Sequence, residues 1–411
     1  MCQVAVISVH GSPLSRFGDR EAGGMQVYVR ELSREMARLG MSVDVFTRLI
    51  EPDAPRVEEF DENARVIRLP AGPVAQVDKN GVLDHLPEFV CGIRRFIAEE
   101  RREYHYLHSH YWLSGWVGKL LASRWGAPHV TTFHTLARLK NEALAGHASP
   151  EPEYRAEVES RIIATADGVI VSSDHERRAL TELYGARRDQ IRVVPPGIDL
   201  DFFQPTPRRF ARTALGRDGR EVLFSAGRMD PIKGFDTLIR SVPLLRRRDV
   251  RLLIGGGGND EPERRRLERL AADLGVADRV AFLGAVPQEK LPLYYAAASL
   301  VVVPSHYESF GLVAAEALAC GTPVVASQVG GLPTIVRDGV NGLLVSWRRP
   351  ESFAAAVDQA LGDPALLAHL RANARLSVER LSWQATAERT IEFYRSLDVA
   401  RQRELACCCH Q

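Results

Sequence analysis

The sequence predicts an α/β protein made of two doubly wound, Rossmann-like domains that face each other across a central cleft. The chain has 411 residues, which is more than one core usually serves, because single hydrophobic cores stop growing at about 250–300 residues. Short apolar runs alternate with amphipathic stretches along its length, a pattern typical of parallel sheets covered by helices. The alternation pauses once near the middle, where a linker between two domains is expected.

The first half of the chain contains apolar runs that have the length of buried strands. A predicted helix lies between the first two runs and begins at Met25, because apolar residues recur there at the 3.6-residue period that places them on one face. Charged residues such as Arg30 and Glu31 fall on the opposite face. The predicted strands cover residues 4–9, 43–46, 66–69, 106–108, 130–133, 169–171 and 191–194.

The pattern of strands and helices stops after Val194 and resumes at Val222. The stretch between them is rich in Pro, Arg and Gly, as linkers often are. We therefore expect an N-terminal domain over residues 1–200 and a C-terminal domain over residues 215–383. A ligand is expected in the crevice where the strands of both domains end. Strands of the second domain are predicted at residues 222–226, 251–254, 280–283, 300–303, 324–326 and 343–345, and helices at 235–245, 262–274, 288–297, 312–319 and 350–361.

Charge and hydropathy exclude several classes of protein. Lysine and arginine total 53, aspartate and glutamate total 52, and the net charge is +1, which argues against a general nucleic-acid-binding protein with a basic surface. No apolar run approaches the ~18–20 residues of a membrane helix, and the first strand lacks the pattern of a signal peptide. The six cysteines form no disulfide framework, which is usual in a reducing compartment. We expect a soluble cytoplasmic protein.

A pair of glycines, Gly23 and Gly24, precedes the helix predicted from Met25. Glycines at such a turn let backbone N–H groups approach a phosphate, and the start of a helix adds partial positive charge. The alternative is a simple turn that leads into the helix. No glycine triplet of the dinucleotide-binding kind follows the first strand, which disfavours a dehydrogenase.

A second candidate is the loop of residues 227–234, which follows the strand predicted at 222–226. This loop contains Gly and Pro, and it carries two cations five positions apart, Arg228 and Lys233. A guanidinium fork together with a compact ammonium suits a diphosphate. The alternative is an exposed basic loop without a ligand.

The third candidate is the segment from Glu308 to Glu316, which follows the strand predicted at 300–303. Glu316 lies in an otherwise apolar helix, where a carboxylate is costly unless it is paired or faces a ligand. It could accept hydrogen bonds from two ribose hydroxyls, and the backbone amides after Glu308 could face an anionic group. The alternative for Glu316 is a buried ion pair with Arg or Lys.

Together these motifs resemble the signature of the retaining glycosyltransferases of family four. The resemblance covers nearly the whole chain, and it implies the GT-B fold, with a final helix at about residues 384–405 that packs back onto the N-terminal domain. The motifs that carry it are Glu308-x7-Glu316 with Phe310-Gly311 inside, Gly227-Arg228-x4-Lys233-Gly234, Pro195-Pro196-Gly197-Ile198-Asp199 and Gly321-Thr322-Pro323-Val324-Val325-Ala326.

The resemblance implies a role for each matching residue. Arg228 and Lys233 would hold the diphosphate and stabilise the leaving group, and Glu316 would bind the ribose. Glu308 would bind the donor sugar beside the amides of Phe310, Gly311 and Leu312. The remaining donor contacts would come from Gly23 and Gly24 at the phosphates, His134 at the sugar, and the backbone around Val286 at the base. Attack from the same face is implied, with the departing phosphate oxygen taking the acceptor proton.

No metal or cofactor is expected, and a UDP-sugar would be the co-substrate. Asp199-Leu200-Asp201 has the form of a metal-binding Asp-x-Asp motif, but it lies in the linker, so we interpret it as a turn and helix cap. His105, His108 and His110 are candidate metal ligands, since His108 and His110 share one face of a strand, but no carboxylate or cysteine completes a metal site. We expect them to be partly exposed residues at a strand end.

The acceptor is expected to carry a phosphate, because the N-terminal half resembles two subgroups that use one. These are the inositol-phosphate N-acetylglucosaminyltransferases of mycothiol synthesis and the bacterial sucrose-phosphate synthases, whose acceptor is fructose 6-phosphate. Residues 23–30 and 134–141 favour the first subgroup, whereas 8–13 and 86–89 favour the second. Gln26 replaces an Asn usual in the first. The positions that match its acceptor site are Gln26, Lys79, Tyr111, Thr135 and Arg155; the alternative is that each is an ordinary surface residue.

Other functions stay open at this point. A nucleotide-sugar epimerase, a phosphorylase or a non-catalytic nucleotide-sugar-binding protein could share the fold, and the acceptor could be unphosphorylated or lipid-linked. No membrane or nucleic-acid partner is expected. The sequence does not decide between a monomer and a homodimer.

Overall fold

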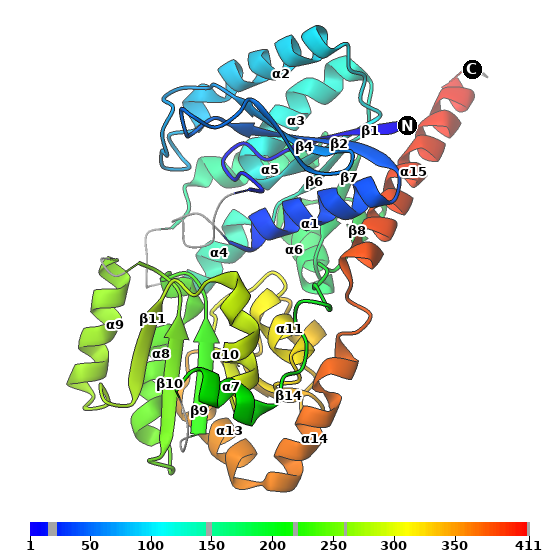
Figure 1. The fold of residues 1–411 in the computed structure, drawn as a ribbon. Helices are drawn as coiled ribbons and strands as arrows, with labels where there is room; N and C mark the ends of the chain where they lie inside the picture. Colours follow the sequence, from blue (N-terminus) through cyan, green and yellow to red (C-terminus); the bar gives the residue numbers. More distant parts are fainter. Residues whose placement is uncertain (15–22, 145–149, 217–220, 259–260, 409–411) are drawn as a thin grey trace.

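Two mainly parallel sheets, one in each half of the chain, form the framework of the computed structural model (Figure 1), which describes residues 1–14, 23–144, 150–216, 221–258 and 261–408. Helices cover both faces of each sheet, so a typical central strand is buried on both sides and reads as a continuous apolar run. In β1, for example, Val4 and Val6 pack into one cluster, whereas Ala5 and Ile7 pack into another on the opposite face. The predicted pair of doubly wound domains is therefore confirmed.

The N-terminal sheet has eight strands in the order β3-β4-β2-β1-β5-β6-β7-β8. All neighbours pair in parallel except β3 and β4. The strands are β1 Cys2–Ile7, β2 Met41–Arg48, β3 Val57–Asp61, β4 Ala64–Leu69, β5 Tyr106–His110, β6 His129–Thr132, β7 Gly168–Val171 and β8 Ile191–Val193. The helices are α1 Gly24–Arg38, η1 Leu83–His85, α2 Leu86–Glu100, α3 Tyr111–Trp125, α4 Ala137–Leu144, α5 Glu153–Ile163, α6 Asp174–Tyr184 and η2 Arg188–Gln190.

The edge strand β3 is absent from the sequence prediction. Its residues are half-buried or exposed, because an edge strand contacts a neighbour on one side only. It pairs with β4 in the antiparallel sense through a short connection in which Asn63 has a φ of 61°, a conformation that Asn tolerates well. A strand that buries so little carries no apolar run.

The C-terminal sheet has six parallel strands in the order β11-β10-β9-β12-β13-β14. The predicted helix at 235–245 splits at Pro243 into an α-helix and a 3-10 turn, since proline lacks the N–H that a helix interior uses. The strands are β9 Glu221–Ala226, β10 Val250–Gly255, β11 Val280–Gly284, β12 Leu300–Val303, β13 Val324–Ser327 and β14 Gly342–Val345. The helices are α7 Arg208–Ala214, η3 Pro231–Lys233, α8 Phe235–Ser241, η4 Val242–Leu244, α9 Pro262–Asp273, η5 Gln288–Lys290, α10 Leu291–Ala297, α11 Leu312–Ala319, α12 Leu332–Ile335, α13 Pro350–Gly362, α14 Pro364–Ala374 and η6 Arg375–Ser377.

The last helix, α15 (Trp383–Cys408), returns to the N-terminal domain, where it lies beside α1 (Figure 1). Ile391 and Tyr394 of α15 are buried in the same apolar cluster as Tyr28 and Val29 of α1. This finding confirms the crossing predicted for the C-terminal helix. The chain passes between the domains twice, once in the linker near Ile198 and once just before α15. These two segments are hydrogen-bonded to each other, because the N–H of Ile198 donates to the carbonyl oxygen of Leu381 at 2.7 Å.

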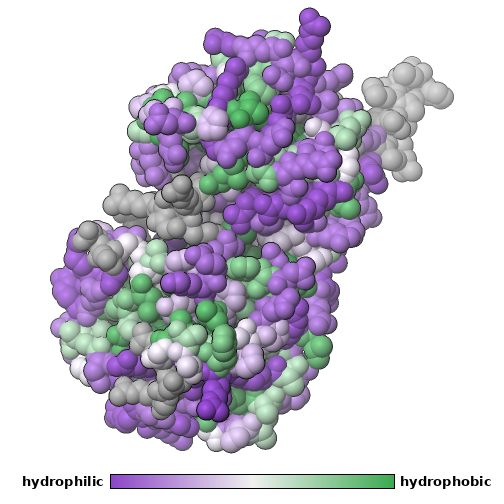
Figure 2. All heavy atoms as spheres, viewed as in Figure 1, coloured by the Kyte–Doolittle hydropathy of each residue, from purple (hydrophilic) through white to green (hydrophobic). Residues whose placement is uncertain are grey.

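Hydrophilic residues cover most of the face shown in Figure 2, and apolar side chains appear there in scattered groups. Among the described residues, no helix combines the length and the apolar character that crossing a membrane requires.

Candidate active site

The loop after β9 places Lys233 at the end of a short 3-10 turn. The Asp230 carboxylate starts this turn by accepting a hydrogen bond from the N–H of Ile232 at 3.1 Å. Gly234 ends it with a φ of 66°, and a Cβ there would lie 2.1 Å from the carbonyl oxygen of Pro304. Only glycine fits this position without a shift of the backbone, so the loop packs tightly against the segment that follows β12.

Lys233 meets Glu308 directly, because its ammonium forms an ion pair with the carboxylate. Ser305 donates a hydrogen bond to the same carboxylate oxygen at 3.1 Å. Arg228, from the same loop as Lys233, lies 3.8 Å from the Asp230 carboxylate, and its side chain is 55% exposed. The structure therefore brings Lys233 and Glu308 together and leaves the Arg228 guanidinium able to turn toward a ligand.

Gly311 turns the chain from Glu308 into α11. Its φ is 104°, and a Cβ would lie 2.6 Å from the side chain of Leu332. The following helix begins at Leu312, so its first amides lie next to Phe310 and Gly311. Across the cleft, a Cβ on Gly24 would lie 3.2 Å from the Leu312 side chain. The N-terminal ends of α1 and α11 thus approach each other at the predicted phosphate position.

Glu316 is paired with a tyrosine. The Tyr295 hydroxyl donates a hydrogen bond to Oε2 of Glu316 at 2.6 Å, and within the described residues no Arg or Lys forms an ion pair with this carboxylate. Burial raises the pKa of Glu316 to about 7, although the hydrogen bond from Tyr295 opposes this shift. The alternative of a buried ion pair is therefore wrong for the described part of the chain.

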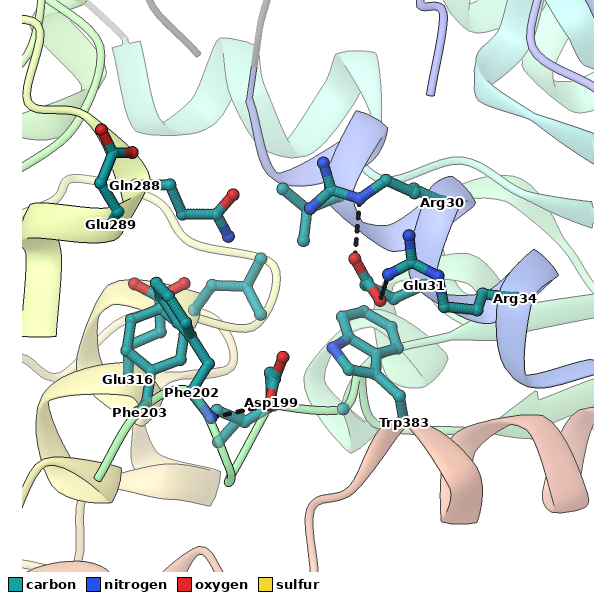
Figure 3. Close-up of a pocket in the computed structure, with 14 residues that line it drawn as sticks. Arg30, Glu31, Arg34, Asp199, Phe202, Phe203, Gln288, Glu289, Glu316 and Trp383 are labelled. Atoms are coloured by element: carbon teal, nitrogen blue, oxygen red, sulfur yellow. Dashed lines mark hydrogen bonds and ion pairs between the residues drawn. The ribbon is translucent and has the colours of Figure 1, made fainter. Parts of the chain in front are cut away.

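Glu316 lines a cavity of about 270 Å³ between the two domains (Figure 3). Arg30, Glu31 and Arg34 of α1 lie on one side, whereas Gln288 and Phe202 lie on the other with Glu316. Sequence reasoning did not predict that α1 and the linker residue Phe202 face this carboxylate, since both are far from Glu316 along the chain. Val286 lies near this region after β11 and packs against Gly255 at the end of β10.

The linker residue Asp199 also lines this cavity. Its carboxylate accepts hydrogen bonds from the N–H groups of Asp201 at 3.2 Å and Phe202 at 2.9 Å. Asp199 therefore shapes a turn, as predicted, but no helix follows, so the expected helix cap is wrong. Across the described ranges, no group of three or more His, Cys, Asp or Glu side chains could hold a metal ion.

Gln26 stabilises the start of α1. Its side-chain oxygen accepts a hydrogen bond from the N–H of Gly23 at 3.0 Å, and its side chain is buried. Its role at the acceptor stays a prediction.

His134 lies where the two domains meet. Its backbone has a positive φ of 60°. Nε2 of its ring lies 3.0 Å from Nδ1 of His110, and its carbonyl oxygen accepts a hydrogen bond from the Ser309 hydroxyl. Burial lowers the pKa of His134 to about 3. The ring is therefore neutral at physiological pH, and it can take part in hydrogen bonds but not supply a positive charge.

His105, just before β5, is exposed, but His108 and His110 are fully buried and not partly exposed as expected. His108 hydrogen-bonds Thr132 at 2.8 Å and the hydroxyl of Tyr394 at 2.7 Å. The expectation is wrong because Tyr394 of α15 packs on His108, whereas Tyr28 of α1 and His134 pack on His110.

Four of the predicted acceptor residues lie close together in the N-terminal domain: Lys79, Tyr111, Thr135 and Arg155. Arg155 donates to the carbonyl and hydroxyl oxygens of Thr135 at 2.8 and 3.1 Å, and its guanidinium lies 4.8 Å from the centre of the Tyr111 ring. Lys79 joins the group through Glu151, which binds both cations. Tyr111 and Arg155 are buried, so the alternative that each is an ordinary surface residue is wrong for these two.

Two further members of this group, Glu151 and Lys140, were not predicted from the sequence. Lys140 contacts the Glu151 carboxylate at 2.8 Å. Glu151 belongs to no recognisable motif, and Lys140 lies within residues 134–141, which carry the subgroup resemblance without assigning it a role at the acceptor. No local pattern signals an ion pair formed between separate elements.

Comparisons with known proteins agree with this architecture. Residues 23–197 match the family model described as glycosyl transferase 4-like domain, and residues 207–377 match glycosyl transferases group 1. The chain is 44% identical to the D-inositol 3-phosphate glycosyltransferase of Nocardiopsis dassonvillei, across 99% of this chain and 97% of the relative. It is 45% identical to the enzyme of the same name from Xylanimonas cellulosilytica, across 95% of this chain and 96% of the relative.

Among solved structures, the sucrose-phosphate synthase of Thermosynechococcus elongatus superimposes with a TM-score of 0.90 at 37% identity, covering 97% of this chain and all of the other. With both domains matched and the family-four motifs at the domain interface, the chain belongs to the group 1 glycosyl transferases of the GT-B fold and is a glycosyltransferase.

Proposed function

We propose that the enzyme moves a hexosyl group from a UDP-sugar to a phosphorylated small acceptor, with retention of configuration. The observation that carries the proposal is that the predicted donor site and the predicted acceptor site lie next to each other. His134 contacts Ser309, the neighbour of Glu308 in the predicted donor site, and the next residue, Thr135, contacts Arg155 in the predicted acceptor site. A sugar bound near Glu308 would thus lie beside the group that binds the acceptor.

The proposed chemistry follows from where charge develops. When the bond from the anomeric carbon to the phosphate breaks, negative charge grows on the diphosphate, and preorganised cations and amides stabilise it. Arg228, Lys233 and the first amides of α11 are the groups proposed to do so. The departing phosphate oxygen would take the acceptor proton, and the neutral His134 ring would hold the sugar by hydrogen bonding.

D-inositol 3-phosphate is the acceptor that we favour, because relatives named for it are 44–45% identical over nearly the whole chain. Fructose 6-phosphate is the second candidate, supported by the likeness to a sucrose-phosphate synthase at 37% identity. Both carry a phosphate monoester, which Lys79, Lys140 and Arg155 could neutralise.

The test is release of UDP from UDP-glucose and from UDP-N-acetylglucosamine, each with D-inositol 3-phosphate or fructose 6-phosphate. We expect one pairing to exceed the others, and we expect the unphosphorylated acceptor to give little turnover. Equal turnover with and without the phosphate would overturn the acceptor proposal and favour an unphosphorylated or lipid-linked acceptor. Sugar isomerisation or release that no acceptor stimulates would favour a nucleotide-sugar epimerase or hydrolase.

A further inference from the structure

The carboxylate of Glu151 binds three cations at once. Its Oε1 lies 2.8 Å from Nζ of Lys79 and 2.8 Å from Nζ of Lys140, and its Oε2 lies 3.0 Å from Nη1 of Arg155. Its side chain is only 6% exposed. A single carboxylate thus occupies the position in which the cations of this group converge.

The Arg155 guanidinium, and the chain segments that carry Lys79 and Lys140, are held by contacts that do not involve the Glu151 side chain. Arg155 pairs with Glu159 at 2.8 Å and binds Thr135. Asn80, the neighbour of Lys79, accepts a hydrogen bond from the Tyr154 hydroxyl at 3.2 Å. Lys140 belongs to α4. The segments that carry the cations are therefore positioned without the Glu151 side chain, so the group resembles an anion site that this carboxylate fills.

The backbone of Glu151 is also fixed independently of its side chain. Its N–H donates to Oδ1 of Asn141 at 2.6 Å, and its carbonyl oxygen accepts from Nδ2 of Asn141 at 3.0 Å. The carboxylate can therefore leave the cations by side-chain rotation alone, while the chain stays in place.

Charge balance shows which ligand would replace the carboxylate. Glu159 is committed to Arg155, to the N–H of Ala137 and to the Tyr184 hydroxyl. With Glu151 in place, the three cations and two carboxylates leave one positive charge; without it they leave two. A phosphate monoester carries about −1.5 to −2 charges near pH 7, so it matches the group only when Glu151 has moved away.

We propose that Glu151 is a specificity-determining residue, whose carboxylate occupies the anion site in the free enzyme and is displaced by the acceptor phosphate. This inference rests on the proposed function, since it assumes a phosphorylated acceptor. An acceptor without an anionic group cannot compete for Lys79, Lys140 and Arg155, so it would leave the site closed by Glu151.

The experiment compares the whole enzyme with Glu151→Gln, Glu151→Asp and the control Glu157→Gln. Glu157 is exposed on the same helix as Arg155, so its variant removes one negative charge without touching the cations. Binding of inorganic phosphate is measured by calorimetry, and the KM values for D-inositol 3-phosphate and for the donor are measured by UDP release. Thermal unfolding shows whether each variant is folded.

We expect Glu151→Gln to bind inorganic phosphate about tenfold more tightly and to lower the acceptor KM, with the donor KM unchanged. Glu151→Asp, with the same charge but shorter reach, should shift both values in the same direction, and Glu157→Gln should match the parent. Weaker or equal phosphate binding by folded Glu151 variants would overturn the inference, because it would mean that Glu151 positions the cations.

Failure of this inference and failure of the proposed function give different results. If the parent enzyme uses a phosphorylated acceptor but the Glu151 variants bind phosphate no better, only the role of Glu151 is overturned. If no phosphorylated acceptor is used and yet the variants gain phosphate affinity, the acceptor proposal fails while Glu151 remains the group that blocks an anion site.

Discussion

The hydroxyl of Ser309 donates a hydrogen bond to the backbone carbonyl oxygen of His134, so it joins the two domains directly. The same serine accepts, through its own carbonyl oxygen, a hydrogen bond from the Ser172 hydroxyl at 2.8 Å. His134 has a positive φ of 60°, a conformation that a non-glycine residue adopts only when its surroundings hold it there. The contact therefore links the shape of the predicted donor loop to the placement of the His134 ring.

We expect Ser309→Ala to lower kcat about fivefold to tenfold, because a hydrogen bond between neutral groups contributes about 1 kcal/mol. Initial rates of UDP release measure the effect. Ser172→Ala is the matched control, since it removes a contact to Ser309 but keeps the bond to His134. A loss in Ser172→Ala with an unchanged Ser309→Ala would show that the backbone contact matters and the His134 contact does not.

Lys233→Ala should lower kcat by about 100- to 1000-fold, the usual loss when one preorganised group at a developing charge is removed. The fold should persist, because the Lys233 ammonium is partly exposed and pairs with a carboxylate, Glu308, that is partly exposed as well. Rates of UDP release and thermal unfolding, measured together, separate the two effects. Arg240→Ala, which removes an exposed cation from the neighbouring helix α8, should behave like the parent enzyme. Normal turnover by folded Lys233→Ala would remove this lysine from the phosphate site.

The sequence predicts the buried strands well and the contacts between distant segments poorly. Strands such as β1 and β12 are covered on both faces and therefore appear as apolar runs, whereas the edge strand β3 buries too little to leave one. The burial of His108 could not be predicted, because the residue that covers it, Tyr394, lies 286 positions away in the sequence. A local pattern carries no information on such a contact.

In the candidate site, too, residues in local motifs could be predicted, whereas contacts between distant segments could not. Lys233 and Glu308 belong to spaced motifs with glycine and proline around them, so their chemistry can be read from the chain, and the structure brings them together. Glu151 belongs to no motif. Its contact with Lys79 spans 72 positions, so only the folded chain shows that a carboxylate fills the space between the predicted acceptor cations.

Arg155→Ala should destabilise the enzyme by about 3–5 kcal/mol, because it leaves Glu151 and Glu159 buried with fewer cations. In the protein that remains folded, the acceptor KM should rise more than the donor KM. Chemical unfolding gives the first quantity and initial rates give the second. Arg161→Ala, an exposed cation on the same helix, is the control for loss of charge. An equal rise of both KM values would make Arg155 a purely structural residue.

Glu316 should make the stability of the enzyme depend on pH. Its pKa in the folded, unliganded enzyme is raised to about 7 from an ordinary value of 4.5, so the folded state holds a proton that the unfolded state releases between these values. The free energy of unfolding therefore falls as pH rises from about 4.5 to about 7, by at most about 3 kcal/mol for this group. Glu316→Gln should lose this part of the pH dependence, and chemical unfolding at several pH values measures it.

The same titration should appear in donor binding with the opposite trend. A carboxylate accepts hydrogen bonds from ribose hydroxyls better than a neutral carboxyl group does, so donor binding favours the ionised form of Glu316. Between pH 8 and pH 6 the ionised fraction falls about tenfold for a pKa of about 7, and the donor KM of the parent enzyme should rise by up to that factor. Glu316→Gln should show a high donor KM that is flat over this range, while titrations that both proteins share cancel in the comparison. The same rise in both proteins would assign the pH dependence to another group and remove Glu316 from the ribose site.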